Sequence, residues 1–270
     1  MTIKRTRVPQ LRIAESVAAE LRDRILSSRE AEYALPPQDQ LVEEFGVSFP
    51  SVREAIRILE TEGLVTVRRG NVGGAEVHRP DESSAAYALG LALQGAQVTL
   101  QDLAEGLQIL EPMCAAECAR HPERNERVVP RLTDNLERSA AVLGDGDGVA
   151  FTHTSREFHE LLVALTPNAT IRYVVSSLTA LWSAQEEAWA ESLTSRGDYF
   201  SESAAKEVIK SHRRIVKEIS AGRATEAERI ARAHLTATQE LFLSRFPDGV
   251  VNATAAKARQ AINSIRSRRG

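Results

Sequence analysis

The sequence predicts a mainly α-helical protein, in which an N-terminal winged helix-turn-helix is followed by an all-helical bundle of six or seven helices. Two observations predict it. In the first 80 residues three helical patterns lead into two short β-branched segments. Beyond residue 84, apolar residues recur at helical spacing in every segment and no strand pattern occurs. The chain of 270 residues is long enough for two domains.

The N-terminal domain is expected over residues 1–79. A first helix over about 11–28 is predicted by apolar residues spaced four apart: Ile13, Val17, Leu21 and Ile25. A short helix over 38–45 ends at Gly46, and Ser48 is a suitable N-cap for a third helix that stops near residue 63. Two short segments, 64–67 and 75–77, flank a turn containing glycine and asparagine, which predicts a β-hairpin. This order of elements is a winged helix-turn-helix.

The remaining chain is divided into a linker, a helical domain and a tail. The polar segment 80–84 is expected to be the linker, 85–246 the helical domain, and 247–270 a flexible basic tail. Within the domain, helices are expected at roughly 84–94, 99–119, 125–143, 148–165, 168–192, 202–221 and 224–245. Their apolar stripes are expected to share one core.

Composition excludes several classes of protein. No stretch approaches the ~20 apolar residues of a membrane span, and no signal-peptide core follows the N-terminus, so we expect a cytoplasmic protein without a membrane partner. The net charge is −3, and basic and acidic residues balance in the first 80 residues, so DNA binding must depend on where the basic groups lie. Cys114 and Cys118 lie four apart on one helical face. They are either a redox or metal pair or, as we favour, two small buried residues.

The start of the third helix and the tip of the hairpin carry the groups that suit DNA. A recognition helix places its first residues in the major groove, while the wing reaches the backbone or the minor groove. The predicted DNA-contacting residues are Ser48, Phe49, Ser51, Arg53, Arg57, Arg68, Arg69, Gly70 and Asn71. For any single arginine, a solvated position on an ordinary helix is the simpler interpretation. Periodicity, turn chemistry and the basic wing together favour DNA binding.

A set of short motifs resembles a known family. They are Leu35-Pro36-Pro37, Phe45-Gly46-Val47-Ser48, Val52-Arg53-Glu54-Ala55-Ile56-Arg57-Ile58-Leu59-Glu60, Glu62-Gly63-Leu64-Val65 and Arg69-Gly70. These motifs resemble the GntR family of bacterial regulators, and the helical remainder is similar to the FCD effector domain of its FadR subfamily. The resemblance runs from about Ala14 to Phe246 and implies a DNA-binding transcription regulator, which we expect to be a repressor. Gln38-Asp39 and Phe49 depart from the family pattern, which affects the expected operator sequence.

Three histidines lie on apolar faces of three predicted helices. Imidazoles from three helices that point into one bundle core can form a metal site, and they suit zinc or nickel. Taken singly, each of His159, His212 and His234 is better explained as a core residue or a small-molecule contact. The resemblance implies that all three are metal ligands. It places Ser155 where the family has an aspartate ligand, so the site is expected either to bind metal more weakly or to use water or the effector as its fourth ligand.

The resemblance also implies a cavity above the metal that takes a small carboxylate. The family's arginine on the first bundle helix corresponds to Leu107, which is not basic. The candidate pocket residues are Gln108, Arg156, Trp182, Gln185 and Trp189. Core packing explains the two tryptophans equally well.

Three functions remain open at this stage. The first is a homodimeric regulator whose affinity for a double-stranded DNA operator is controlled by a small-molecule effector. The second is a hydrolase-like activity of a three-histidine metal site, for which Glu157 or Glu160 would be the base. The third is a purely structural histidine core. We expect the regulator and no enzyme.

Overall fold

The computed structural model describes residues 10–28, 33–67, 75–144, 147–196, 202–244 and 248–254. The chain divides into two compact units, Met1–Pro80 and Asp81–Gly270. In the described segments, no helix combines the length and the apolar character that crossing a membrane requires.

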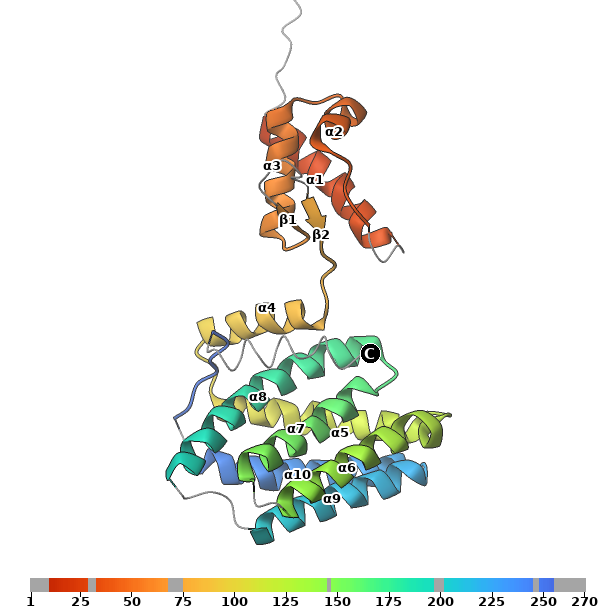
Figure 1. The fold of residues 1–270 in the computed structure, drawn as a ribbon, viewed down its shortest axis with the longest axis vertical. Helices are drawn as coiled ribbons and strands as arrows, with labels where there is room; N and C mark the ends of the chain where they lie inside the picture. Colours follow the sequence, from red (N-terminus) through yellow and green to blue (C-terminus); the bar gives the residue numbers. More distant parts are fainter. Residues whose placement is uncertain are drawn as a thin grey trace, which may run out of the picture. The chain divides into compact units, whose positions relative to one another are not determined.

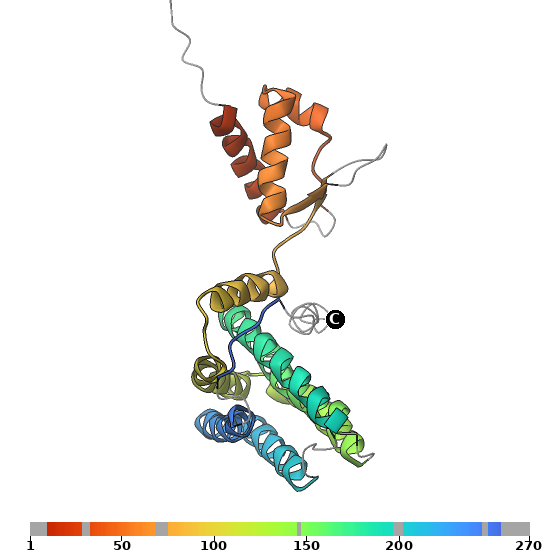
Figure 2. The same cartoon turned by 90° about the vertical axis from the view of Figure 1, so that its left-hand side faces the viewer.

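The N-terminal unit contains the three helices and the hairpin in the predicted order (Figure 1). Helix α1 spans Gln10–Ser27, α2 Gln38–Phe45 and α3 Phe49–Thr61. Strands β1 (Val65–Val67) and β2 (Ala75–Val77) are antiparallel. Figure 2 shows α3 beside α1, and the two helices bury a shared core that α2 and β1 complete.

The turn between α2 and α3 is encoded locally. Gly46 adopts φ 60°, a left-handed conformation that costs glycine little, and so ends α2. The backbone N–H of Val47 then donates to Val42 O, and Ser48 is the N-cap of α3. Arg22 on α1 forms an ion pair with Glu62 after α3. This fixes the far end of α3, so its first turn has a defined orientation within the unit.

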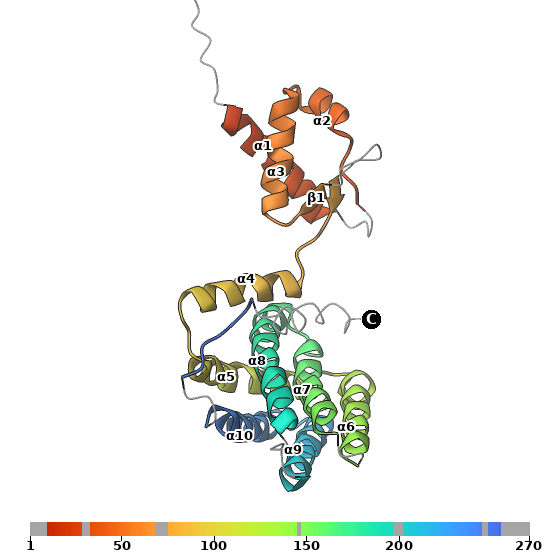
Figure 3. The same ribbon diagram turned by 60° about the vertical axis from the view of Figure 1, so that its left-hand side comes forward.

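The C-terminal unit is a helical bundle, as predicted. In the part of the chain that is described it contains seven α-helices and one π-helical turn: α4 (Glu82–Gly95), α5 (Leu100–Arg120), η1 (Arg124–Val128), α6 (Val129–Gly144), α7 (Gly148–Ala164), α8 (Ala169–Arg196), α9 (Glu202–Ser220) and α10 (Ala224–Leu243). Helix α5 packs along α10, α7 packs along α8, and α4 crosses α8 (Figure 3). One continuous apolar core joins these helices.

The segment between the two units is shorter than the predicted linker, 80–84. Helix α4 begins at Glu82, inside the segment 80–84, and Glu82 and Ser83 are both buried. The reason is that Asp81 is the N-cap of α4, a role that the polar composition of this segment did not reveal. The carboxylate of Asp81 accepts hydrogen bonds from the backbone N–H of Ser84 at 3.0 Å and from the hydroxyl of Ser83 at 2.6 Å.

Residues 248–254, the described part of the expected flexible tail, pack against the bundle. The N–H of Leu100 donates to Gly249 O at 2.7 Å, and the N–H of Val251 donates to Val98 O at 2.9 Å. Val251 and Ala253 are buried against the bundle. Gly90 on α4 permits this approach, because a Cβ at Gly90 would lie 2.7 Å from the Cβ of Ala253. The basic end of the tail lies outside the described residues.

Candidate functional site

Helix α3 presents one exposed face that suits DNA. Phe49, Arg53 and Arg57 are spaced four apart, so they share that face, while the opposite side of α3 is buried in the core. Phe49 is 46% exposed, and the Arg57 side chain is 76% exposed with an ion pair to Glu54 at 3.6 Å. An aromatic ring and two guanidinium groups therefore line the surface at and beyond the first turn of α3.

The two serines predicted beside them differ from each other. Ser51 is only 2% exposed, and its hydroxyl lies 3.0 Å from that of Ser48. Ser51 therefore points into the unit and does not offer its hydroxyl to DNA, which corrects the prediction. The wing residues Arg68, Arg69, Gly70 and Asn71 lie outside the described residues.

The three histidines converge in the core of the bundle. Nε2 of His212 on α9 lies 3.2 Å from Nε2 of His159 on α7 and 2.9 Å from Nε2 of His234 on α10. Their candidate ligand atoms all lie within 4.8 Å of one another. Phe158 stacks on the His212 ring at 3.9 Å with an angle of 8° between the planes, which holds that imidazole in place.

Glu111 on α5 orients the first of these rings. Its Oε1 lies 2.6 Å from Nδ1 of His159, and the residue is only 4% exposed. Burial alone would lower the pKa of His159, but the charge and the hydrogen bond of Glu111 outweigh burial and raise it. In the neutral form of His159 the carboxylate can hold the Nδ1–H, and the Nε2 lone pair is then directed at the other two rings, as in carboxylate–histidine–metal arrangements.

The other two imidazoles are held neutral. Burial, together with the neighbouring histidines, keeps the pKa of His212 well below its usual range. Burial and His159 lower the pKa of His234 to about 3. Neutral imidazole is the form that ligates a metal ion.

This arrangement fits a divalent cation better than it fits hydrogen bonding. Nε2 of His212 has two Nε2 neighbours but carries only one proton or one lone pair in the ring plane, so it cannot form an ordinary linear hydrogen bond with both. A tetrahedral ion with bonds of about 2.0–2.1 Å needs nitrogen atoms roughly 3.3 Å apart, close to the separations observed. Ser155 lies one helical turn before His159 on α7 and lines a cavity near the cluster.

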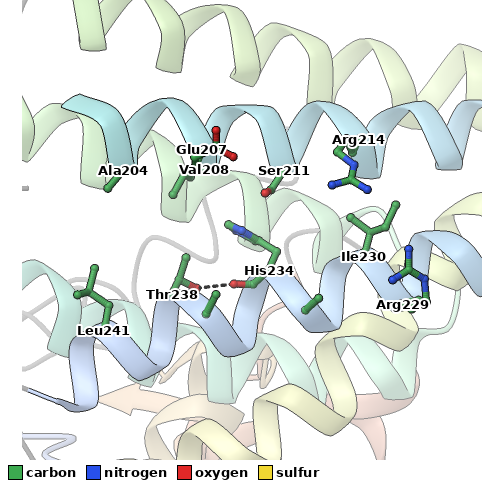
Figure 4. A pocket seen from close by; sticks show the side chains of 12 residues that line it. Ala204, Glu207, Val208, Ser211, Arg214, Arg229, Ile230, His234, Thr238 and Leu241 are labelled. Carbon is green, nitrogen blue, oxygen red and sulfur yellow. Dashed lines mark hydrogen bonds between the residues drawn. The ribbon is translucent and has the colours of Figure 1, made fainter. Parts of the chain in front are cut away.

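Two cavities adjoin the histidine cluster. An inner cavity of about 70 Å³ is lined by α7, α8, α9 and α10, and includes Ser155, Arg156 and Glu186. A groove of about 340 Å³ lies between α9 and α10, with His234 on its wall (Figure 4). The two cavities share Val208, Thr238 and Leu241.

Of the four predicted pocket residues whose side chains the structure describes, only Arg156 lines either of these cavities. Gln108 donates to Gln239 and links α5 to α10, while Gln185 faces Leu181 O and Asn252 O at the tail. Trp182 is buried and packs against Phe242, so it agrees with the core-packing interpretation of this tryptophan. The side chain of Trp189 lies outside the described part of the structure.

Two acidic residues of the site were not predicted. Glu111 occupies a core position in the apolar stripe of α5, between Leu107 and Ala115, and a charge at such a position is a usable sequence signal. Glu186 lines the inner cavity, and nothing in its local sequence distinguishes it. By contrast, Glu157, a candidate base, has its carboxylate engaged by Arg138 and Asn135 on α6.

The two cysteines are core residues. Both are free thiols, and burial raises the pKa of each to about 12. Cys118 Sγ lies 3.4 Å from Leu162 O. In the folded bundle both cysteines therefore pack as small apolar side chains.

A winged helix-turn-helix with an arginine-bearing recognition helix, joined to a helical domain with a polar buried site, defines a ligand-responsive DNA-binding regulator. Residues 13–73 match the bacterial regulatory proteins of the gntR family, and residues 102–237 match the FCD domain. The chain belongs to the GntR family of transcription regulators and carries an FCD effector-binding domain.

Two relatives agree with this assignment. The HTH-type transcriptional regulator LutR of Bacillus subtilis (strain 168) is 25% identical over 214 residues, which cover 78% of this chain and 91% of LutR. The solved structure of Streptococcus agalactiae GntR has a TM-score of 0.61 at 19% identity and covers 86% of this chain and 99% of that one. At that identity the second comparison supports the fold alone.

Proposed function

We propose that this regulator binds its operator as a homodimer and changes its DNA affinity when a small molecule binds beside a divalent metal ion in the FCD domain. The observation that carries the proposal is the convergence of three Nε2 atoms beside a groove that His234 lines, in a domain joined to a DNA-binding unit. Effector binding that favours one arrangement of the two units typically couples the sites by ~1–3 kcal/mol.

On the DNA side, the proposed contacts are Ser48, Phe49, Arg53 and Arg57, with the wing segment 68–71. The exposed face of α3 supports the first group. Arginine can pair with guanine or phosphate, and the Phe49 ring can pack on a thymine methyl group. A helix-turn-helix dimer reads two half-sites about 34–36 Å apart, so the operator is expected to be a palindrome. We expect a repressor, acting in the cytoplasm where a bacterium keeps its DNA.

On the effector side, His159, His212 and His234 would hold zinc or nickel. The bound ion would supply a positive charge and an open coordination position. Glu111 orients His159, and Phe158 holds His212. A serine hydroxyl is a poor ligand at neutral pH, so water or the effector would complete the coordination in place of Ser155. A small carboxylate would suit such a site.

The test combines metal analysis with DNA binding. The purified protein is analysed for zinc and nickel before and after a chelator, and its affinity for its own upstream DNA is followed by fluorescence anisotropy. Stoichiometric metal, lost in His212→Ala, together with salt-dependent DNA binding, supports the proposal. DNA binding by a protein that never takes up metal would assign the three histidines to the core or to direct effector contacts.

A further inference from the structure

Arg156 is a buried cation with unused hydrogen-bond donors. Arg156 is only 6% exposed, and its Nη2 donates to the carboxylate of Glu187. Its Nε and Nη1 are buried and have no hydrogen-bond partner among the described residues. A buried donor on a charged group that lacks an acceptor is costly, so an acceptor of complementary charge is expected to bind there.

The inner cavity is where such an acceptor would bind. Arg156 lines it from α7, beside the hydroxyl-bearing Thr152 and Ser155. A carboxylate is the small group that best matches a guanidinium in both charge and planar geometry. The cavity therefore supplies an anchor for an anionic group that is separate from the converging Nε2 atoms of the histidines.

A second charged group in the same cavity has the opposite sign. Glu186 lines it from α8, and it interacts with Arg156, Trp182, His159 and Glu111. Glu186 and Glu187 together bring two carboxyl groups to one guanidinium, so a simple carboxylate ligand would enter surroundings that already hold more acidic than basic groups. Burial raises the pKa of Glu186, and Arg156 and a hydrogen bond with Trp182 lower it only in part. A cationic partner for Glu186 would offset that burial.

The size and shape of the two cavities restrict the remainder of the ligand. The inner cavity, about 70 Å³, accommodates only a head group. It shares the lining residues Val208, Thr238 and Leu241 with the 340 Å³ groove, and Figure 4 shows these three residues toward the same end of that groove. At this end the wall has an apolar part formed by Ala204, Val208 and Leu241, and Glu207 lies beside it (Figure 4). Arg214 and Arg229 lie at the other end (Figure 4).

We propose that the effector is an apolar α-amino acid, with its carboxylate on Arg156, its ammonium group on Glu186 and its side chain in the groove between α9 and α10. This assignment rests on the proposed function for its regulatory consequence, but binding itself can be measured without DNA.

The experiment uses the full-length protein. The twenty common L-amino acids are screened by thermal shift, and the best apolar one is titrated by calorimetry beside its deaminated acid and its decarboxylated amine. For L-leucine these are 4-methylpentanoic acid and 3-methylbutylamine. Each analogue lacks one charged group, so each should bind about tenfold to a hundredfold more weakly.

Variants assign the two contacts. Arg156→Gln should abolish measurable binding, and Glu186→Gln should remove the preference for the amino acid over its deaminated acid. Arg213→Gln and Glu240→Gln change exposed residues of α9 and α10 and should bind as the unmodified protein does. If Arg156→Gln does not fold, Arg156→Lys keeps the charge without the guanidinium fork and should bind measurably but more weakly.

Three results would overturn the inference: no amino acid binds, the deaminated acid binds equally well, or both charge variants bind normally. Amino-acid binding that leaves operator affinity unchanged would support this site and contradict the proposed regulation. Operator affinity that responds to another small molecule, with no amino acid bound, would support the regulation and contradict this site.

Discussion

Replacing Glu111 with glutamine isolates the effect of one carboxylate on the three-histidine cluster. Glutamine keeps the size of the side chain and an oxygen that can accept from Nδ1 of His159, at the 2.6 Å separation now observed. What it removes is the negative charge, which is almost completely buried. Outer-shell partners of this kind typically change metal affinity by about 10–100-fold.

That loss has a defined thermal consequence. A ten- to hundredfold weaker Kd reduces the stabilisation that excess metal confers by about 1.4–2.7 kcal/mol. For a domain of this size the zinc-induced increase in Tm should shrink by roughly 3–10 °C. The metal-free protein should melt at nearly the same temperature or higher, because the variant no longer buries a carboxylate at position 111.

The assay measures zinc affinity by competition with a chromophoric chelator, and Tm with and without zinc. Glu117→Gln is the matched control, since Glu117 lies on the same helix but pairs with Arg120 at the surface. It should leave both quantities unchanged. Equal zinc affinity in Glu111→Gln and the unmodified protein would refute the assignment of Glu111 as the residue that orients His159.

Three further predictions concern other parts of the molecule. Arg53→Ala should weaken operator binding and reduce the salt slope by about 1, because one phosphate or base contact is lost; an anisotropy titration that shows neither change would remove Arg53 from the interface. Burial raises the pKa values of Cys114 and Cys118 to about 12, in place of 9.0, so at pH 8 each should hold roughly a thousandfold less thiolate than an ordinary cysteine. Both should react with a disulfide reagent only after unfolding, and reaction of both in the native protein would contradict their burial. Gly90→Ala should destabilise the C-terminal unit by about 1–3 kcal/mol and expose the Val251 amide to hydrogen exchange, because the Cβ of the new alanine would clash with Ala253. Gly95→Ala is the control, since a Cβ at Gly95 meets no neighbour within 4 Å.

The helices could be predicted from sequence because the signals that set them are local. Apolar residues at helical spacing define each buried stripe. Gly46 ends α2, and Ser48 occupies the N-cap position of α3 without a side-chain capping hydrogen bond. Sequence reasoning missed a helix end at which a polar side chain serves as a cap. Asp81 caps α4 and so starts the helix inside an apparently unstructured linker.

The DNA-facing residues illustrate how much a helical rotation decides. Phe49, Arg53 and Arg57 follow the four-residue period and share the exposed face, whereas Ser51 lies two positions from Phe49 and turns inward. Hydroxyl chemistry suggested a contact that the 3.6-residue period excludes. The same period, applied before the chemistry, predicts the burial of Ser51.

The pocket was harder to predict than the histidine cluster, for a physical reason. Each histidine is a polar residue in an apolar stripe, so its inward direction follows from its own helix. A pocket residue must also meet the open space left between other helices, and that depends on how side chains from four elements fill the interior. Gln108 and Gln185 lie on partly buried faces but fill their space with partners from α10 and the tail. Arg156 differs because it lines a cavity that Glu186 also lines and has two donors without a partner among the described residues, and that combination of charge and space gives the site its proposed selectivity for a zwitterion.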